Sequence, residues 1–180
     1  MKKEIIREVE IPEGITMELE NAKIIINGPE GKNERNYKMP NVSVEKKENK
    51  LVISSKKGTK NEKKLVNTFA AHVNNMVKGV QKKFEYRLKV CFSHFPINVE
   101  IKGKEVVIKN FLGEKVPRKT LIPEGVEVDL DKDFITVTST DLEKAGQVAA
   151  NFEVATKIRN RDKRVFQDGI FIISKAGGED

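Results

Sequence analysis

The sequence predicts an α+β fold of two tandem, duplicated domains, each a small antiparallel β-sheet with one helix packed on a face. Strand-like runs occur in the same order in both halves, an amphipathic helix follows each set, and both helices begin with the same motif. A chain of 180 residues is long enough for two small domains. We expect the first repeat over residues 1–80 and the second over residues 81–180.

Alternating apolar and polar residues mark the expected strands of each repeat. In the first repeat these strands cover residues 23–26, 39–44 and 51–54. In the second repeat they cover residues 105–108, 122–128 and 134–137. Turns that contain glycine, at residues 28–32 and 110–115, follow the first strand of each set. We read residues 169–174 as a closing strand of the second repeat and residues 176–180 as a loose tail.

A T-x-x-E motif precedes each expected helix, at Thr59 with Glu62 and at Thr140 with Glu143. In such a capping box the hydroxyl and the carboxylate bond backbone N–H groups that the first helical turn leaves unpaired. We therefore expect the helices to begin at the two threonines. Gly79 is a natural end for the first helix.

Apolar residues at spacings of three and four give each helix one face for packing against the sheet. In the first helix they are Leu65, Phe69, Val73 and Met76. In the second helix they are Leu142, Ala145, Val148, Ala149 and Phe152. Residues 80–94 would link the two repeats and supply a strand that both share.

The composition favours a reducing compartment and an anionic partner. The net charge of +7 and the pI near 9.3 suggest a polyanion, although a modest positive balance alone is weak support. No apolar run approaches the roughly 18 residues of a membrane span, and no apolar segment follows the charged N-terminus as in a secretory signal. A single cysteine, Cys91, excludes an intrachain disulfide. We expect a cytoplasmic protein with no membrane partner.

Residues with catalytic or metal-binding chemistry are few. Cys91 and His94 form a C-x-x-H pair, but a structural zinc site needs about four ligands and His72 is the only other Cys or His. A Cys91–His94 nucleophile is the enzyme alternative, and no carboxylate at a recognisable spacing would orient it. Residues 28–32 lack the spacing of a phosphate-binding loop, and residues 124–133 lack that of a calcium loop. We predict no catalytic residue, no metal site and no cofactor.

Basic residues gather in three groups, of which residues 157–164 are the most informative. This segment lies between the second helix and the closing strand, where a loop could hold several cations along a phosphate backbone. The second group is Lys102, Lys104, Lys109, Lys115, Arg118 and Lys119, and the third is Lys56, Lys57, Lys60, Lys63 and Lys64. Without an RNP motif, a KH loop or a tryptophan, RNA would be bound through its phosphates and shape, not through splayed bases. The alternatives are a solvated charged turn and a protein-interaction module that uses the acidic strand or the lysine-rich helix.

Several of these stretches resemble the large ribosomal subunit protein six family, in its archaeal and eukaryotic branch. They are residues 94–99, residues 110–115 with Arg118, and residues 161–171. The most specific piece is the R-x-F-x-D-G signature from Arg164 to Gly169, followed by a β run and Lys175. Residues 28–31 are similar to the family's G-P-x-G loop in the first domain. The resemblance extends from near Ile11 to Lys175.

This resemblance implies two tandem α+β domains, no catalysis, and binding to large-subunit ribosomal RNA mainly through the second domain. It places such a protein at the stalk base near the sarcin–ricin loop, with ribosomal proteins as neighbours and translation factors nearby. The expected RNA-binding residues are Lys109, Arg118, Lys119, Lys157, Arg159, Asn160, Arg161, Lys163, Arg164 and Lys175. In the signature we expect Phe166 to pack inward. We expect Asp168 and Gly169 to shape a turn, because glycine permits a positive φ and aspartate can bond its own turn.

Overall fold

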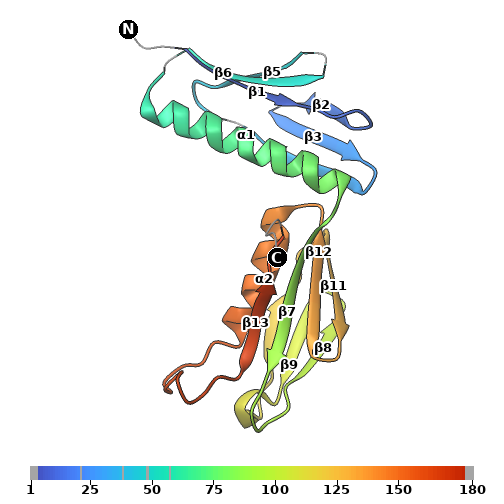
Figure 1. Ribbon diagram of the computed structural model, residues 1–180, viewed down its shortest axis with the longest axis vertical. Helices are drawn as coiled ribbons and strands as arrows, with labels where there is room; N and C mark the ends of the chain where they lie inside the picture. The colour runs from blue at the N-terminus through green and yellow to red at the C-terminus, as the bar shows by residue number, and fades with distance from the viewer. Residues whose placement is uncertain (1–3, 21, 38, 48, 57, 177–180) are drawn as a thin grey trace. The chain divides into compact units, whose positions relative to one another are not determined.

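The computed structural model describes residues 4–20, 22–37, 39–47, 49–56 and 58–176 (Figure 1). The chain divides into two compact units between Lys83 and Phe84, shortly after the expected boundary. Both units combine one long helix with small antiparallel sheets, so the prediction of a tandem α+β fold is confirmed. Each unit has two sheets where the sequence suggested one. The end of the expected loose tail, residues 177–180, lies outside the described residues, as does Lys57.

The first unit has two three-stranded sheets and one helix. Its elements are β1 (Ile5–Glu10), β2 (Thr16–Glu20), β3 (Lys23–Gly28), β4 (Gly31–Asn36), β5 (Ser43–Lys47), β6 (Lys50–Ser55) and α1 (Lys60–Gln81). The sheet orders are β1-β6-β5 and β2-β3-β4, with every pairing antiparallel. The expected strand over residues 39–44 begins only at Ser43, because residues 40 and 41 form a turn.

Helix α1 covers both sheets of the first unit and buries one apolar face between them. Its buried side chains include Val66, Phe69, Val73 and Met76, which pack on strands β1, β3, β4 and β6. The expectation for Leu65 is wrong: that side chain is 36% exposed, and its neighbour Val66 occupies the core.

The end of α1 differs from the sequence prediction, because Gly79 does not stop the helix. Gly79 is buried inside it, and the helix ends at Gln81. The hairpin turn between β3 and β4 bonds this end: the N–H of Glu30 donates to the carbonyl of Val80 at 3.0 Å. The last carbonyls of a helix have no intrahelical partner. The glycine-containing turn at residues 28–32 is therefore a structural contact with the helix.

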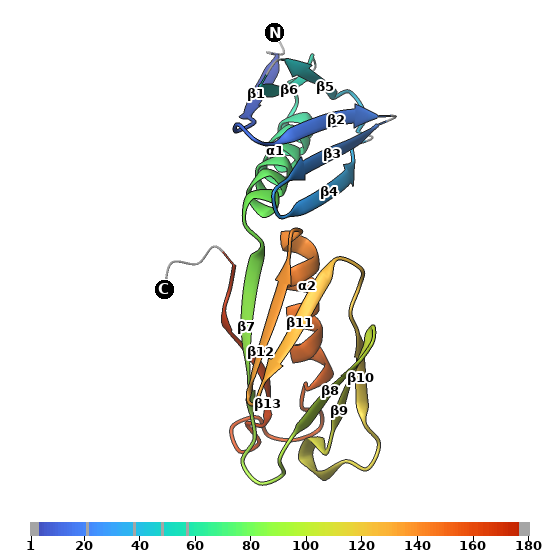
Figure 2. The same cartoon turned by 90° about the vertical axis from the view of Figure 1, so that its right-hand side faces the viewer.

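The second unit contains the remaining elements. They are β7 (Phe84–Cys91), β8 (Asn98–Lys102), β9 (Glu105–Lys109), the short 3-10 helix η1 (Phe111–Gly113), β10 (Arg118–Leu121), β11 (Val126–Asp131), β12 (Phe134–Ser139), α2 (Leu142–Ala155) and β13 (Gly169–Ser174). Figure 2 shows the three-stranded sheet β10-β9-β8 and the four-stranded sheet β11-β12-β7-β13. Strand β7 pairs with β12 and β13 inside this unit, so the prediction that both repeats share it is wrong.

Helix α2 packs on both sheets of the second unit. Ala145, Val148, Ala149 and Phe152 are buried, as the spacing predicted, and the helix contacts β7, β12 and β13 of one sheet and β10 of the other. Strand β11 alternates as predicted between half-buried Val126, Val128 and Leu130 and exposed acidic residues. Within the described part of the chain, neither α1 nor α2 is long and apolar enough to cross a membrane.

The helix starts follow the predicted motifs only in part. Thr59 is the N-cap of α1, but its side chain makes no capping hydrogen bond. In α2 the N-cap is Asp141 and not Thr140. The Asp141 carboxylate accepts from the backbone N–H groups of Glu143 at 2.9 Å and Lys144 at 3.4 Å. Aspartate caps helices as readily as threonine does, and here it lies one residue nearer to the first turn.

Candidate nucleic-acid interface

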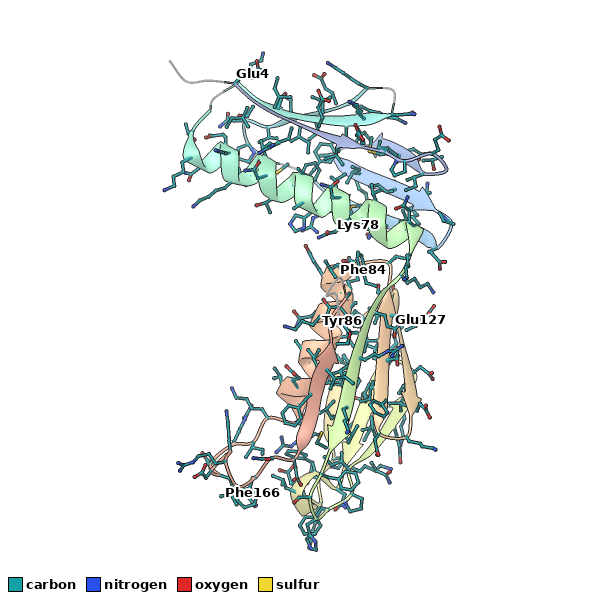
Figure 3. The ribbon with its side chains drawn as sticks, in the orientation of Figure 1. Glu4, Lys78, Phe84, Tyr86, Glu127 and Phe166 are labelled. Atoms are coloured by element: carbon teal, nitrogen blue, oxygen red, sulfur yellow. The ribbon has the colours of Figure 1, made fainter. Side chains whose placement is uncertain are left out.

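The segment of residues 157–164, called here the basic loop, connects α2 to β13 in the second unit. Its side chains are exposed except for Ile158, which is buried in the core of the unit. Asn160 adopts a left-handed backbone conformation with φ of 57°, a conformation that asparagine tolerates better than most residues. The buried side chain of Ile158 and the bend at Asn160 therefore leave the charged side chains of the loop facing solvent (Figure 3).

Asp162, the acidic residue of the basic loop, forms an ion pair with Arg164 of the same loop. Arg164 donates from Nη2 to Oδ2 at 2.7 Å and from Nε to Oδ1 at 3.1 Å, and its backbone N–H bonds Oδ1 at 2.9 Å. The side-chain bond from Arg164, followed by this backbone bond, holds the pKa of Asp162 below its ordinary value. Arg164 is therefore engaged inside the loop, and Asp162 cancels its charge.

Arg161 is also held locally, whereas three other cations extend into solvent. The Arg161 guanidinium lies over the Phe166 ring, 4.8 Å from its centroid. Lys157, Arg159 and Lys163 are exposed, and their charged ends form no ion pair with any described residue. Unpaired cations on a short loop can bind an anion without first breaking an internal ion pair.

The signature residues hold the basic loop in place, although not all in the expected way. Phe166 packs against the core of the unit, as predicted. Asp168 is buried and accepts from the backbone N–H of Ser93 at 3.1 Å, so it joins the loop to the end of β7 and does not bond its own turn. The expected positive φ at Gly169 is absent. A Cβ at Gly169 would instead lie 2.9 Å from Cζ of Phe171, so glycine is favoured there by space.

Arg118 has a structural position, unlike that of a cation exposed for RNA. It donates to both carboxylate oxygens of Glu114, at 2.6 and 2.8 Å, and to the carbonyls of Ala155 and Lys157 at 2.9 and 3.1 Å. These four bonds engage most of its five N–H groups. Its guanidinium also lies 4.2 Å from the centroid of the Phe111 ring. Arg118 thus joins β10 to the end of α2, where the basic loop begins.

The other predicted lysines lie in different settings. Lys109 pairs with Glu100 at 2.5 Å, and Lys119 pairs with Glu105 at 3.0 Å, both on the β10-β9-β8 sheet. Lys119 and Arg159 line one hollow, so Lys119 adjoins the basic loop. Lys175 is exposed just beyond the end of β13 that lies away from the loop. The structure therefore brings Lys119 to the loop and leaves Lys175 apart from it.

Sequence reasoning missed the side chains by which α2 holds β13. The N–H of Ile170 donates to Oγ1 of Thr156 at 3.0 Å, and the N–H of Ile172 donates to Oε1 of Glu153 at 2.9 Å. These two N–H groups lie on the side of β13 that faces away from β7. Nothing in the sequence indicates these pairs, because their members are distant along the chain and have ordinary residue types.

The residues weighed for metal or thiol chemistry do not assemble a site. Cys91 is half-buried at the end of β7, and the His94 ring lies edge-on to the Phe95 ring, with centroids 4.6 Å apart. Among the described residues, no three or more His, Cys, Asp or Glu side chains are placed to hold a metal ion.

Comparison with known proteins decides the family. The ribosomal protein L6 profile matches residues 7–83 and 95–169, which cover both repeats. The chain belongs to the ribosomal protein L6 family. It is 42% identical over 168 residues to the large ribosomal subunit protein uL6 of Methanobrevibacter smithii, across 93% of this chain and 94% of the relative. The protein of the same name in Methanosarcina mazei is 41% identical over 98% of this chain, and that in Staphylothermus marinus 43% identical over 93%.

Membership of the L6 family confirms the resemblance first seen in the signature and the tandem repeats. It agrees with the prediction that the chain is not an enzyme, and it goes against a non-ribosomal interaction module. The match to the family extends to Gly169, the last residue of the signature.

Proposed function

We propose that this chain is a structural constituent of the large ribosomal subunit that binds large-subunit, 23S-type ribosomal RNA through its second unit. Its place would be the stalk base near the sarcin–ricin loop, in the cytoplasm, beside other ribosomal proteins and close to translation factors. Membership of the L6 family across both repeats supports the ribosomal role. The charges of the second unit support RNA as its partner.

The observation that carries the proposal is the set of three unpaired cations on the anchored basic loop. Lys157, Arg159 and Lys163 are exposed beside an acid that Arg164 already neutralises. Ile158, Phe166 and Asp168 fix the backbone on which they stand. Ordering a mobile loop costs conformational entropy, so a loop held by its own protein loses less on binding phosphates.

The remaining predicted residues have supporting parts in this proposal. Arg118 holds the start of the loop against β10. Arg161 and Arg164 stabilise the loop's bend and add positive potential to its surface. Lys109 and Lys119 would have to exchange their glutamate partners for phosphates, so we expect them to contribute less than the three unpaired cations.

We test the proposal by replacing Lys157, Arg159 and Lys163 together with alanine. The wild-type chain should bind in vitro transcribed large-subunit rRNA, and the variant should bind it more weakly. The slope of log K against log salt should fall by roughly one for each lost phosphate contact. The melting temperature should be unchanged, because these side chains form no ion pair with described residues.

The matched control removes the same charge from the first unit, through Lys60, Lys63 and Lys64 together to alanine. These lysines are exposed on the first turns of α1. The control should retain the wild-type salt slope. An equal loss of rRNA affinity in both variants would mean that only the net charge of the chain matters, and it would refute the assignment of the basic loop. A wild-type chain that fails to bind the rRNA would refute the proposed function itself.

A further inference from the structure

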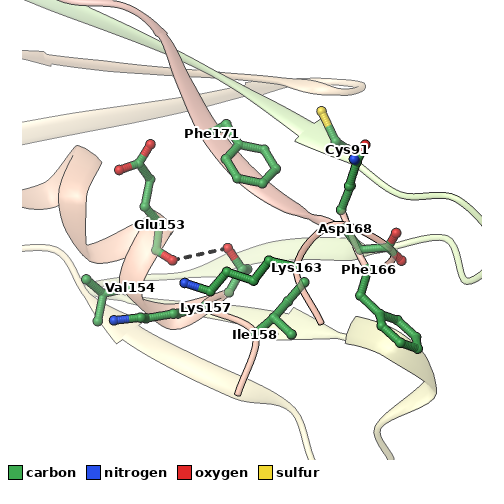
Figure 4. Close-up of a pocket in the computed structure, with 11 residues that line it drawn as sticks. Cys91, Glu153, Val154, Lys157, Ile158, Lys163, Phe166, Asp168 and Phe171 are labelled. Carbon is green, nitrogen blue, oxygen red and sulfur yellow. Dashed lines mark hydrogen bonds between the residues drawn. The ribbon is translucent and has the colours of Figure 1, made fainter. Parts of the chain in front are cut away.

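A hollow of about 730 Å³ opens in the second unit between the end of α2, the basic loop and strands β7 and β13 (Figure 4). Cys91, Ile158, Phe166 and Phe171 give it a largely apolar wall. Lys157 and Lys163 line it as well. Sites for small ligands usually have volumes of about 300–1,000 Å³ and combine apolar walls with a few polar groups, so this hollow has the dimensions of a binding pocket.

We propose that this pocket receives one unpaired nucleobase of the bound RNA, which stacks on Phe171 while Lys157 and Lys163 hold the adjacent phosphates. This inference rests on the proposed function and adds a specific subsite to it. It departs from the expectation that RNA is bound through phosphates and shape alone. That expectation was based on the absence of known RNA-binding motifs in the sequence. A motif search does not detect this pocket, because its residues are far apart in the sequence.

The chemistry of the pocket favours a nucleotide over an apolar protein side chain. A nucleotide combines a flat ring with a negative charge, and the pocket presents an aromatic ring and two ammonium groups. The carboxylates of Glu153 and Asp168 also line it, and each already accepts a hydrogen bond from a backbone N–H group. Phe171 is 45% exposed, so its ring has a surface that protein does not cover. Lys157 and Lys163 belong to the same basic loop that is proposed to follow the RNA backbone. An apolar side chain would leave both lysines without a counterion.

Gly169 keeps the pocket open. A Cβ at this position would lie 2.9 Å from Cζ of Phe171 and 3.6 Å from Oγ1 of Thr156, and both residues line the pocket. A side chain at Gly169 would have to displace the Phe171 ring from its position in the pocket wall. The glycine of the R-x-F-x-D-G signature thus helps to shape the pocket. This role accounts for a glycine at a position where φ is not positive.

The walls of the pocket are fixed by hydrogen bonds before any ligand arrives. Asp168 is bonded to the N–H of Ser93, and Thr156 accepts from the N–H of Ile170. Phe166 has one face covered by Arg161, so its ring is held as a wall and is less open to a base than Phe171. A pocket formed in advance binds its ligand without paying for a rearrangement.

The first test compares Phe171→Ala with Phe134→Ala. Both phenylalanines face the same side of the sheet, where they flank Lys89 in register, and they are 45% and 44% exposed. Of these two residues, only Phe171 lines the pocket. Phe171→Ala should bind large-subunit rRNA about tenfold or more weakly with the salt slope unchanged, because stacking and not charge is lost. Phe134→Ala should bind like the wild type, and equal affinities for both variants would overturn the inference.

The second test needs no substitution, because Cys91 is the only cysteine of the chain and lines the pocket. Bound rRNA should slow alkylation of Cys91 by N-ethylmaleimide in the native chain. RNA binding that leaves the alkylation rate unchanged overturns the inference but not the proposed function. Protection that appears only when other ribosomal proteins are added assigns the pocket to a protein side chain and also overturns it. If the rRNA does not bind at all, both proposals fall.

Discussion

Gly28 lies where the hairpin between β3 and β4 meets the end of α1. A Cβ there would be 2.8 Å from both the carbonyl oxygen and Cγ2 of Val80, so a larger residue must push the hairpin off the helix. We expect Gly28→Ala to lower the free energy of unfolding by about 1–3 kcal/mol, the usual cost of overpacking. Thermal denaturation followed by circular dichroism measures this effect, and an unchanged melting temperature would contradict the close approach.

Glu114 makes the stability of the second unit depend on pH. The hydrogen bond from Arg118 is the main reason why the pKa of Glu114 lies below its ordinary value of 4.5. Folding therefore favours the ionised carboxylate. Its contribution is complete above pH 4.5 and is lost as the pH falls through the lowered pKa. The carboxylate is 40% exposed, so solvent weakens this contribution.

Replacing Glu114 with glutamine tests this dependence. Glu114→Gln should be less stable than the wild type at pH 7, by at most about 1 kcal/mol. The two proteins should converge as the pH falls through the lowered pKa of Glu114, where the wild-type carboxyl becomes protonated too. Urea denaturation at several pH values measures the difference. A deficit that stays constant down to pH 3 would mean that the charge of Glu114 is not involved.

The roles of single residues were predictable from sequence where they depend on neighbours along the chain. The exposed cations of the basic loop are an example, because a polar segment between a helix and a strand has to lie at the surface. The contacts of Arg118 and Asp168 could not be predicted, since their partners Ala155 and Ser93 are distant in sequence. A charged residue in a basic group can serve packing or binding, and only the three-dimensional contacts distinguish the two.

The two helices provide a matched comparison of caps. Asp141 bonds two N–H groups at the start of α2, whereas the Thr59 side chain makes no such bond at the start of α1. Asp141→Ala should cost about 1 kcal/mol of stability, the typical loss of an N-cap bond. Thr59→Ala should change stability by less than about 0.5 kcal/mol, as for most surface substitutions. Equal losses, measured by thermal unfolding, would contradict the assigned caps.

Most elements could be placed from periodicity, and their errors have a common cause. Strands β3, β6, β9, β12 and β13 lie where alternation predicted them. Strands β1, β2, β4, β8 and β10 were not predicted, and among the predicted elements the misplaced features are ends: α1 continues past Gly79, and α2 is capped by Asp141. Ends depend on a few hydrogen bonds, such as the one from Glu30 to Val80, that the hydrophobic pattern does not record.

At the scale of the whole chain, the second repeat contains a strand and a basic loop that the described part of the first repeat lacks. The sheets β1-β6-β5 and β11-β12-β7-β13 correspond strand by strand, except that no described strand of the first unit takes the place of β13. The segment without a counterpart follows α2 and consists of the basic loop, the signature and β13. This difference explains why the second unit carries both proposed RNA contacts, and why repeat detection alone could not assign them.

The hydrogen bonds from α2 to β13 also protect the edge of the sheet in a newly made chain. An edge strand with unpaired N–H groups is a template on which another chain can add a strand and start aggregation. Thr156 and Glu153 occupy two of these donors on β13, next to the exposed side chains of Phe171 and Ile173. A newly made chain is thereby protected against strand addition at this edge, by the same helix end that shapes the proposed base pocket.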